Sequence, residues 1–104
     1  MVYFDDIPLP AQKKTKTVSR EFFAPKPGAY TLRVVKPATG VVGNLEVRLN
    51  GALVTGPNQG NSRVTLIPVA IQSENTISAK LVDAERGSDG RAGLLLLIEP
   101  SDVN

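Results

Sequence analysis

The pair Asn50-Gly51 is the feature that most constrains the fold of this chain. It follows segment 44–49, in which apolar and polar residues alternate, and it precedes another apolar run. Asn-Gly supplies the two residues of positive φ that a type I′ turn requires, and the twist of this turn matches that of antiparallel strands. We therefore predict a β-hairpin over 44–54. The local sequence shows no partner that would give Asn50 a chemical role.

The same two-residue alternation recurs along most of the chain. It marks further strands at 15–23, 29–36, 63–71 and 76–81, and a continuous apolar run marks one at 93–98. Pro68 predicts either an edge strand or a bulge that splits 63–71, because proline has no N–H to donate to a sheet. Turns rich in Gly, Pro and Asn separate the segments, and none shows a helical period. The sequence thus predicts an all-β protein, a single antiparallel β-sandwich that is immunoglobulin-like, with about seven or eight strands.

The length of 104 residues is typical of one domain. We assign 15–100 to the sandwich and 101–104 to a tail. Residues 1–14 are predicted to be either an edge strand that closes the sandwich or an extended arm that pairs with a neighbouring copy. No run of about 18 apolar residues is present, so we expect no membrane insertion. The first ten residues do not have the pattern of a signal peptide. Either the protein stays inside the cell or the sequence is an excised domain, and we favour the second interpretation.

The net charge of +2 is unevenly distributed. Residues 12–36 carry seven basic side chains and one acidic one, a balance of +6, whereas 1–11 and 37–104 each carry −2. This basic segment is either a solvated face or a surface that attracts an acidic partner, such as the loops of a second copy. The candidate interaction residues, apolar in the arm and basic after it, are Tyr3, Phe4, Ile7, Leu9, Lys13, Lys14, Lys16 and Arg20. Nucleic acid is disfavoured as a partner, because no aromatic residues are interleaved with the basic ones.

Reactive side chains are scarce. The chain has no cysteine and no histidine, which excludes Ser-His-Asp triads, Cys-His dyads and the usual zinc sites. We predict no catalytic residues, no cofactor and no enzymatic activity. Loop 83–92 carries the calcium candidates Asp83, Glu85 and Asp89, but their spacing fits no EF-hand and two arginines intervene. We therefore favour a solvated loop and assign no metal site.

Several turn and core motifs within 20–98 occur together in a known group of proteins. They are Gly28 with Tyr30-Thr31-Leu32, Leu49-Asn50-Gly51 with Gly56-Pro57, and Asn75-Thr76-Ile77. With them, the chain resembles the small immunoglobulin-like β-sandwich modules of bacterial extracellular and cell-surface proteins. The resemblance implies a secreted or surface-attached, non-catalytic module, although a cytoplasmic location stays open. It does not supply a binding site.

Two functions are left open by the sequence. The leading prediction is a module that acts through protein–protein contacts, either as a spacer or as a self-assembling structural subunit that adds its arm to a neighbour's sheet. The segment 94–97, apolar on both faces, is either covered on both sides or presents Leu95 and Leu97 to a partner. The alternative is a carbohydrate-binding module. Phe22 and Phe23 point to opposite faces of a strand, so one of them would offer a small platform for a polysaccharide.

Overall fold

The computed structural model describes residues 2–37, 39–55, 63–87 and 93–101. These ranges contain eight strands: β1 (Tyr3–Pro8), β2 (Lys14–Phe23), β3 (Gly28–Val35), β4 (Asn44–Leu49), β5 (Ala52–Leu53), β6 (Val64–Ile71), β7 (Glu74–Ala84) and β8 (Gly93–Pro100). In the part of the chain so described there is no helix, and hence no helix that could cross a membrane. The predicted all-β class is confirmed.

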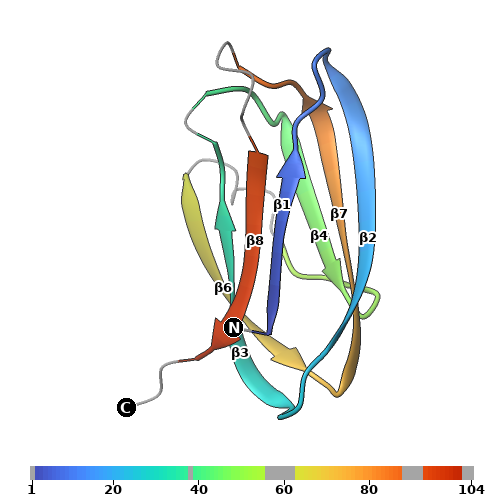
Figure 1. Ribbon diagram of the computed structural model, residues 1–104, viewed down its shortest axis with the longest axis vertical. Helices are drawn as coiled ribbons and strands as arrows, with labels where there is room; N and C mark the ends of the chain where they lie inside the picture. The colour runs from blue at the N-terminus through green and yellow to red at the C-terminus, as the bar shows by residue number, and fades with distance from the viewer. Residues whose placement is uncertain (1, 38, 56–62, 88–92, 102–104) are drawn as a thin grey trace.

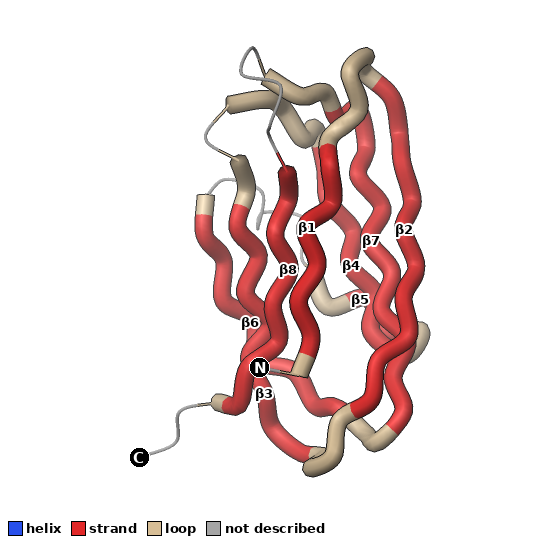
Figure 2. The backbone as a smooth tube through the Cα atoms, in the orientation of Figure 1, coloured by secondary structure: helices blue, strands red, loops and turns tan. Residues whose placement is uncertain are grey.

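The strands form two antiparallel sheets of four, packed as two layers (Figure 1, Figure 2). The first sheet has the order β1-β8-β3-β6 and the second the order β2-β7-β4-β5. The predicted sandwich and its number of strands are therefore confirmed. Its likeness to immunoglobulin domains lies in this layered architecture, because the strand order is that of an eight-stranded jelly roll built from two Greek keys. Consecutive strands alternate between the sheets, except that β4 and β5 form a hairpin in the second sheet. β1 and β2 are each an edge strand, and side-chain contacts join them along one open side of the sandwich.

The core lies between the sheets and consists of the inward residues of the alternating segments. Every second residue of β3, β4, β7 and β8 is buried, as the period of two predicts. The largest fully buried side chains are Ile7, Leu32, Val47, Ile77, Leu81, Leu94, Leu96 and Ile98. Complete burial of one such aliphatic side chain contributes about 1.5–3 kcal/mol. The arm is part of this core through Ile7.

The predicted hairpin forms at Asn50 and Gly51. Their φ angles of 53° and 87° are both positive, as a type I′ turn requires, and β5 pairs with β4 directly after the turn. A second positive φ, 52° at Asp83, accompanies a register shift in the pairing of β2 with β7. This bulge lets β7 continue to Ala84, beyond the predicted end of the strand at residue 81, because a bulge absorbs the polar residue without breaking the ladder.

Pro68 lies in the middle of β6, which is one uninterrupted strand. β6 pairs only with β3 and forms the far edge of the first sheet, so the edge-strand interpretation of Pro68 is confirmed. Proline removes a donor from an edge that would otherwise offer hydrogen bonds to another strand. The open edge of the first sheet is thereby a poor template for strand addition.

Candidate functional site

The N-terminal arm is an edge strand of its own sheet. β1 pairs with β8 over six residues, from Tyr3 opposite Ile98 to Pro8 opposite Gly93. Two of the predicted interaction residues, Ile7 and Leu9, lie in the core of this chain, where they are 2% and 5% exposed. Phe4 points outward and is 55% exposed. The arm therefore contributes apolar burial to its own domain, and among its described residues Phe4 is the large apolar side chain that is exposed.

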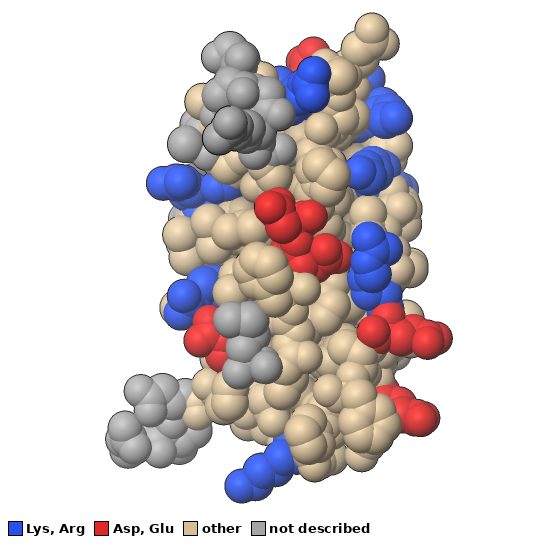
Figure 3. Space-filling view, viewed as in Figure 1, with Lys and Arg blue, Asp and Glu red and all other residues tan. Residues whose placement is uncertain are grey.

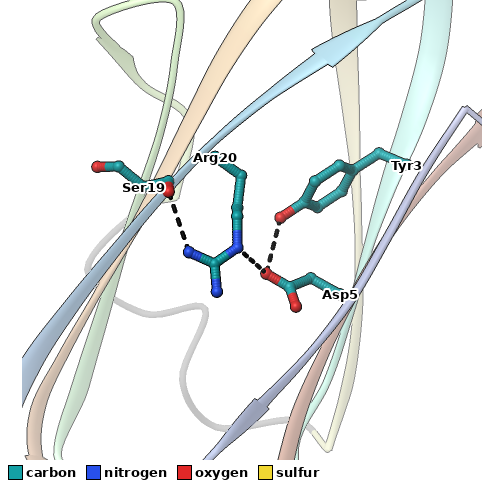
Figure 4. A network of polar contacts seen from close by, with 4 residues as sticks. All are labelled: Tyr3, Asp5, Ser19 and Arg20. Atoms are coloured by element: carbon teal, nitrogen blue, oxygen red, sulfur yellow. Dashed lines mark hydrogen bonds and ion pairs between the residues drawn. The ribbon is translucent and has the colours of Figure 1, made fainter.

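Of the predicted basic interaction residues, Lys14, Lys16 and Arg20 lie on β2, next to the acidic residues of β1 (Figure 3). The Lys16 ammonium donates to the carbonyl oxygen of Pro8 at 3.1 Å. The Nε atom of Arg20 lies 3.4 Å from Oδ2 of Asp5 (Figure 4). Both contacts join β2 to β1 across the open side of the sandwich. Part of the charge contrast between 1–11 and 12–36 is therefore used in contacts within the chain, while Lys13 and Lys14 remain exposed.

Tyr3 completes this seam between β1 and β2. Its hydroxyl donates to Asp5 Oδ2 at 3.0 Å, and its ring centroid lies 5.0 Å from that of Phe22 on β2. Burial, followed by the hydrogen bond and the charge of Asp5, raises the pKa of the Tyr3 phenol well above its usual value. Inward-facing charges on edge strands also discourage pairing with other chains. Contacts between β1 and β2 of the same chain therefore close this side of the sandwich.

The two outer faces of the sandwich differ in chemistry. The outward row of β6 is wholly apolar and exposed, with Val64, Leu66, Pro68 and Ala70. On the other three strands, Phe4, Leu95, Leu97 and Val35 are also outward and apolar, and they alternate with the outward polar residues Asp6, Thr31, Arg33 and Glu99. We call the set of eight apolar residues the apolar face. The strand segment 94–97 buries Leu94 and Leu96 and turns Leu95 and Leu97, which are half-buried, to the outside.

The second sheet is polar on its outside. Most of its outward residues are polar: Thr15, Thr17, Ser19 and Glu21 on β2, Thr76, Ser78 and Lys80 on β7, and Glu46 and Arg48 on β4. The apolar exceptions are Val82 and the exposed Phe23 and Leu53. Small hydroxyl side chains and charges of both signs are typical of a face that stays in water. Because both faces belong to the same small domain, the apolar face marks the side on which a partner would be expected.

The calcium candidates do not assemble in the described part of the chain. Asp83 and Glu85 are both exposed, and Asp89 lies outside the described residues. Within those residues, no three acidic side chains come close enough to hold a metal ion. Gly56-Pro57, which contributed to the family resemblance, also lies outside them.

A second surface feature lies at the end of the sandwich where β2 ends and β7 begins. It is an open hollow of about 630 Å³ lined by Glu21, Phe22, Phe23, Asn50, Gln72, Glu74, Asn75 and Thr76. We call it the end hollow. Three separate chain segments meet there: the end of β2, the β4–β5 turn and the β6–β7 turn (Figure 1). Its volume falls within the range of small-molecule sites, about 300–1,000 Å³.

Asn75 holds these segments together. It is 4% exposed, and its Oδ1 atom accepts from the backbone N–H of Gln72 and from Nδ2 of Asn50, both at 3.0 Å. Its Nδ2 atom donates to the carbonyl oxygen of Gln72 at 2.6 Å. Asn50 Oδ1 in turn accepts from the backbone N–H of Thr76 at 2.8 Å. The Asn50 side chain therefore has structural partners on β7, which the sequence could not show because they lie about 25 residues away.

The two adjacent phenylalanines have different surroundings. Phe22 is half-buried and packs against the core and the Tyr3 ring. Phe23 is 65% exposed at the rim of the end hollow. The expectation that one of the pair would be exposed is met by Phe23. Gln72 and Glu74 were missed at the sequence level, because they lie in a polar turn whose proximity to β2 depends on the pairing of β2 with β7.

The fold defines a single β-sandwich module with one apolar face and one end hollow. No protein-family model matches the chain, and no curated protein matches it. Among solved structures, it is similar to a β-glucosidase from Kluyveromyces marxianus, with a TM-score of 0.59 and 13% identity over 86% of this chain. It is also similar to a β-porphyranase of glycoside hydrolase family 86 from Bacteroides plebeius, with a TM-score of 0.48 and 14% identity over 98% of the chain. The chain spans 11% and 21% of the lengths of these two proteins. At 13% identity, the likeness to the β-glucosidase concerns the fold alone.

Proposed function

We propose that this chain is a non-catalytic β-sandwich module that acts through protein–protein contact, and that the apolar face is its contact surface. The observation that carries this proposal is the contrast between the outer faces. Phe4, Val64 and Leu66 are each at least half exposed on the first sheet. The second sheet presents mainly hydroxyls and charges, with Phe23 and Leu53 as its exposed large apolar residues. Burying the apolar face against another surface would recover about 25 cal/mol per Å² of apolar area.

A second copy of the chain is the partner that the charges favour. Arg33 and Glu99 lie on the apolar side of β3 and β8 and form an ion pair of 3.5 Å. A two-fold axis parallel to the strands and between β3 and β8 would place β3 of one copy over β8 of the other. Arg33 of each copy would then lie over Leu97 of its partner, one row from the partner's Glu99, because Arg33 pairs with Leu97 in the sheet. The same axis places Phe4 over Leu66, because both lie on one row across the sheet.

The expected association is weak. Four strands spaced by about 4.8 Å and six residues of about 3.3 Å each give a face of about 400 Å². Two such faces bury about 800 Å² in total, which is at the lower end of specific interfaces. We therefore place the contact among transient interactions, unless several copies in one assembly strengthen it.

Donation of the arm to a neighbour is the less favourable route to assembly. It would require β1 to leave β8 and would take Ile7 and Leu9 out of the core. It would also separate the Lys16 and Arg20 contacts with β1. A contact through the sheet face leaves all of these interactions intact.

A non-catalytic role is supported by the available side chains. Without cysteine or histidine, acid–base chemistry would depend on paired carboxylates, and a carboxyl group acting as a general acid is normally protected from water. Glu21 and Glu74, the carboxylates of the end hollow, are both exposed. An exported or cell-surface setting is part of the proposal and rests on the family resemblance.

The test is the mass of the protein in solution across a concentration series, measured by sedimentation velocity. We expect reversible growth from monomer to dimer that Leu66→Lys abolishes. Thr17→Lys, which adds the same charge on the outer face of the second sheet, is the matched control and should leave the dimer unchanged. Arg33→Glu should weaken association, and Arg33→Glu combined with Glu99→Arg should restore it. A monomer at every concentration, or equal effects of the two lysine variants, would refute self-association through the apolar face.

A further inference from the structure

We propose that the end hollow is a binding site for a neutral saccharide, with Phe23 as the platform on which a sugar ring stacks. Glu21, Glu74, Gln72 and Thr76 would supply the hydrogen-bonding groups around it. This site lies on the second sheet and does not depend on the apolar face of the first. It gives the chain a ligand in addition to the protein contact proposed above.

The floor of the hollow is fixed before any ligand arrives. Asn75 and Asn50 tie the β4–β5 turn and the β6–β7 turn to the start of β7 through four hydrogen bonds of 2.6 to 3.0 Å. Both side-chain amides are therefore engaged in the structure itself. A site with a rigid frame loses little conformational entropy on binding, which favours recognition of a small ligand by few contacts.

The remaining polar groups of the hollow are free to bind. In the described part of the chain, the side chains of Glu21, Glu74, Gln72 and Thr76 make no hydrogen bond or ion pair. Carboxylates accept hydrogen bonds, a hydroxyl both donates and accepts, and an amide offers a donor and an acceptor. Sugar hydroxyls also donate and accept, so this mixed set suits them. The hollow thus combines two asparagines held by hydrogen bonds within the chain with polar side chains that are free to bind a ligand, as expected of a ligand-binding site.

Phe23 lies among these free groups. It is directly opposite Glu74 in the pairing of β2 with β7, and Glu21 is two residues before it on the same face of β2. Directly opposite residues have Cβ atoms about 4.5–5.5 Å apart, and diagonal neighbours such as Glu21 and Glu74 are about 7–8 Å apart. A pyranose ring stacked on Phe23 through its C–H face would therefore have a carboxylate within reach on two sides.

The charge of the hollow selects among ligands. Its lining carries two carboxylates and no basic residue, although the chain as a whole has a net charge of +2. Uronic-acid and sulfated polysaccharides would be repelled. A basic peptide could also use the carboxylates and the Phe23 ring, and its backbone carbonyls could accept from Gln72 and Thr76, so it is the competing ligand in the test below. We favour a neutral saccharide because its ring can stack on Phe23 while its hydroxyls pair with carboxylate, amide and hydroxyl groups alike.

The experiment is a titration of the ¹⁵N-labelled full chain, followed by amide chemical shifts. The probes are neutral gluco-, xylo- and manno-oligosaccharides of β1,4 and β1,3 linkage, oligogalacturonate as the anionic case, and a lysine-rich peptide as the cationic case. We expect a neutral oligosaccharide to shift amides of residues 21–23 and 72–76. Its affinity should be nearly the same at about 50 and 500 mM salt, because no charge pairing is involved.

Matched variants connect the binding to the proposed residues. Phe23→Ala should weaken binding about tenfold, the loss expected for one aromatic contact. Glu74→Gln keeps the shape and removes an acceptor charge, and should weaken it about fivefold. Val41→Ala, at an exposed apolar residue outside both the apolar face and the end hollow, should have no effect. Unchanged urea midpoints for all three variants would show that the fold is intact.

Three results would overturn the saccharide site. They are the absence of shifts with every neutral oligosaccharide, shifts confined to residues outside 21–23 and 72–76, and equal affinity of Phe23→Ala and the parent chain. Salt-sensitive binding of the lysine-rich peptide at the same residues, without saccharide binding, would instead assign the hollow to a cationic protein segment.

Discussion

The hydrogen bonds of Asn75 should be among the most stabilising side-chain interactions in the domain. In Asn75→Ala, the three bonds to Gln72 and Asn50 are lost. A neutral hydrogen bond contributes about 0.5–1.5 kcal/mol, so their loss costs about 1.5–4.5 kcal/mol. Gln72 is exposed and can bond to water instead, which brings the expected loss to about 2–3 kcal/mol. Urea denaturation should then show a midpoint lowered by about 1–2 M.

A double-mutant cycle of Asn75→Ala with Asn50→Gly measures the coupling free energy between the two side chains. Glycine tolerates the φ of 53° at this position, so the substitution removes the side chain with little backbone strain. Both single variants break the bond from Asn50 Nδ2 to Asn75 Oδ1. The cycle should therefore show a coupling free energy of about 0.5–1.5 kcal/mol. Asn44→Ala, at an exposed asparagine that begins β4, is the control and should change stability by less than about 0.5 kcal/mol.

Two outcomes would refute this reasoning. If the effects of Asn75→Ala and Asn50→Gly add within about 0.3 kcal/mol, the two amides are not coupled. If Asn75→Ala costs no more than the Asn44→Ala control, the bonds at the end hollow do not stabilise the fold. The argument for a preformed saccharide site would then lose its frame.

Three further predictions concern the arm and the open edge. Ile7→Ala should lower the free energy of unfolding by about 2–5 kcal/mol while Phe4→Ala changes it by less than about 0.5 kcal/mol, in urea denaturation, because only Ile7 is buried; equal losses would contradict the arm's placement. The pKa of Tyr3 is raised in the folded state, so its contribution to the free energy of unfolding is complete below the unfolded-state pKa of about 10 and declines at higher pH. Tyr3→Phe loses the hydrogen bond to Asp5 and should therefore be less stable at pH 7. In thermal unfolding, the stability of this variant should fall less steeply than that of the parent chain as the pH rises above about 10. A decline of the same steepness in both proteins would argue against it. Pro68→Thr should restore a donor to the edge of β6 and speed aggregation, measured by light scattering at unchanged stability, and no increase would show that proline does not protect this edge.

The fold followed from local patterns to a large extent. Alternation of apolar residues predicted the strands at 15–23 and 44–49, and a continuous apolar run predicted the strand at 93–98. Asn50-Gly51 predicted the turn. All of these signals depend on neighbours in the sequence. The bulge at Asp83 was not predicted, since an aspartate in a polar stretch resembles a loop residue. The order of the strands in the two sheets could not be predicted from alternation, because it depends on which strands pair over long distances in the sequence.

The sites were less predictable than the strands, for a related reason. Lys16 and Arg20 were interpreted as part of an interaction surface, yet their contacts with Pro8 and Asp5 lie across the seam of the same chain. A charge pattern in one dimension does not show whether its complement is in the same molecule. Exposure of Phe23 rather than Phe22 likewise depends on Tyr3, which occupies the space beside Phe22 only after β1 and β2 have become neighbours.

The closure of the seam and of the far edge decides where a partner can bind. Strand addition needs an open edge, but β1 and β2 are joined by Tyr3, Asp5 and Arg20, and β6 lacks a donor at Pro68. The other edge of the second sheet is β5, which has only two residues. A partner is then left with the flat surfaces and the ends of the sandwich. The apolar face suits a second sheet of the same kind, and the end hollow suits a small ligand with hydroxyl groups. Because the apolar face and the end hollow belong to different sheets, both could be occupied at once. Substitutions at Leu66 and Phe23 should therefore affect the two kinds of binding independently.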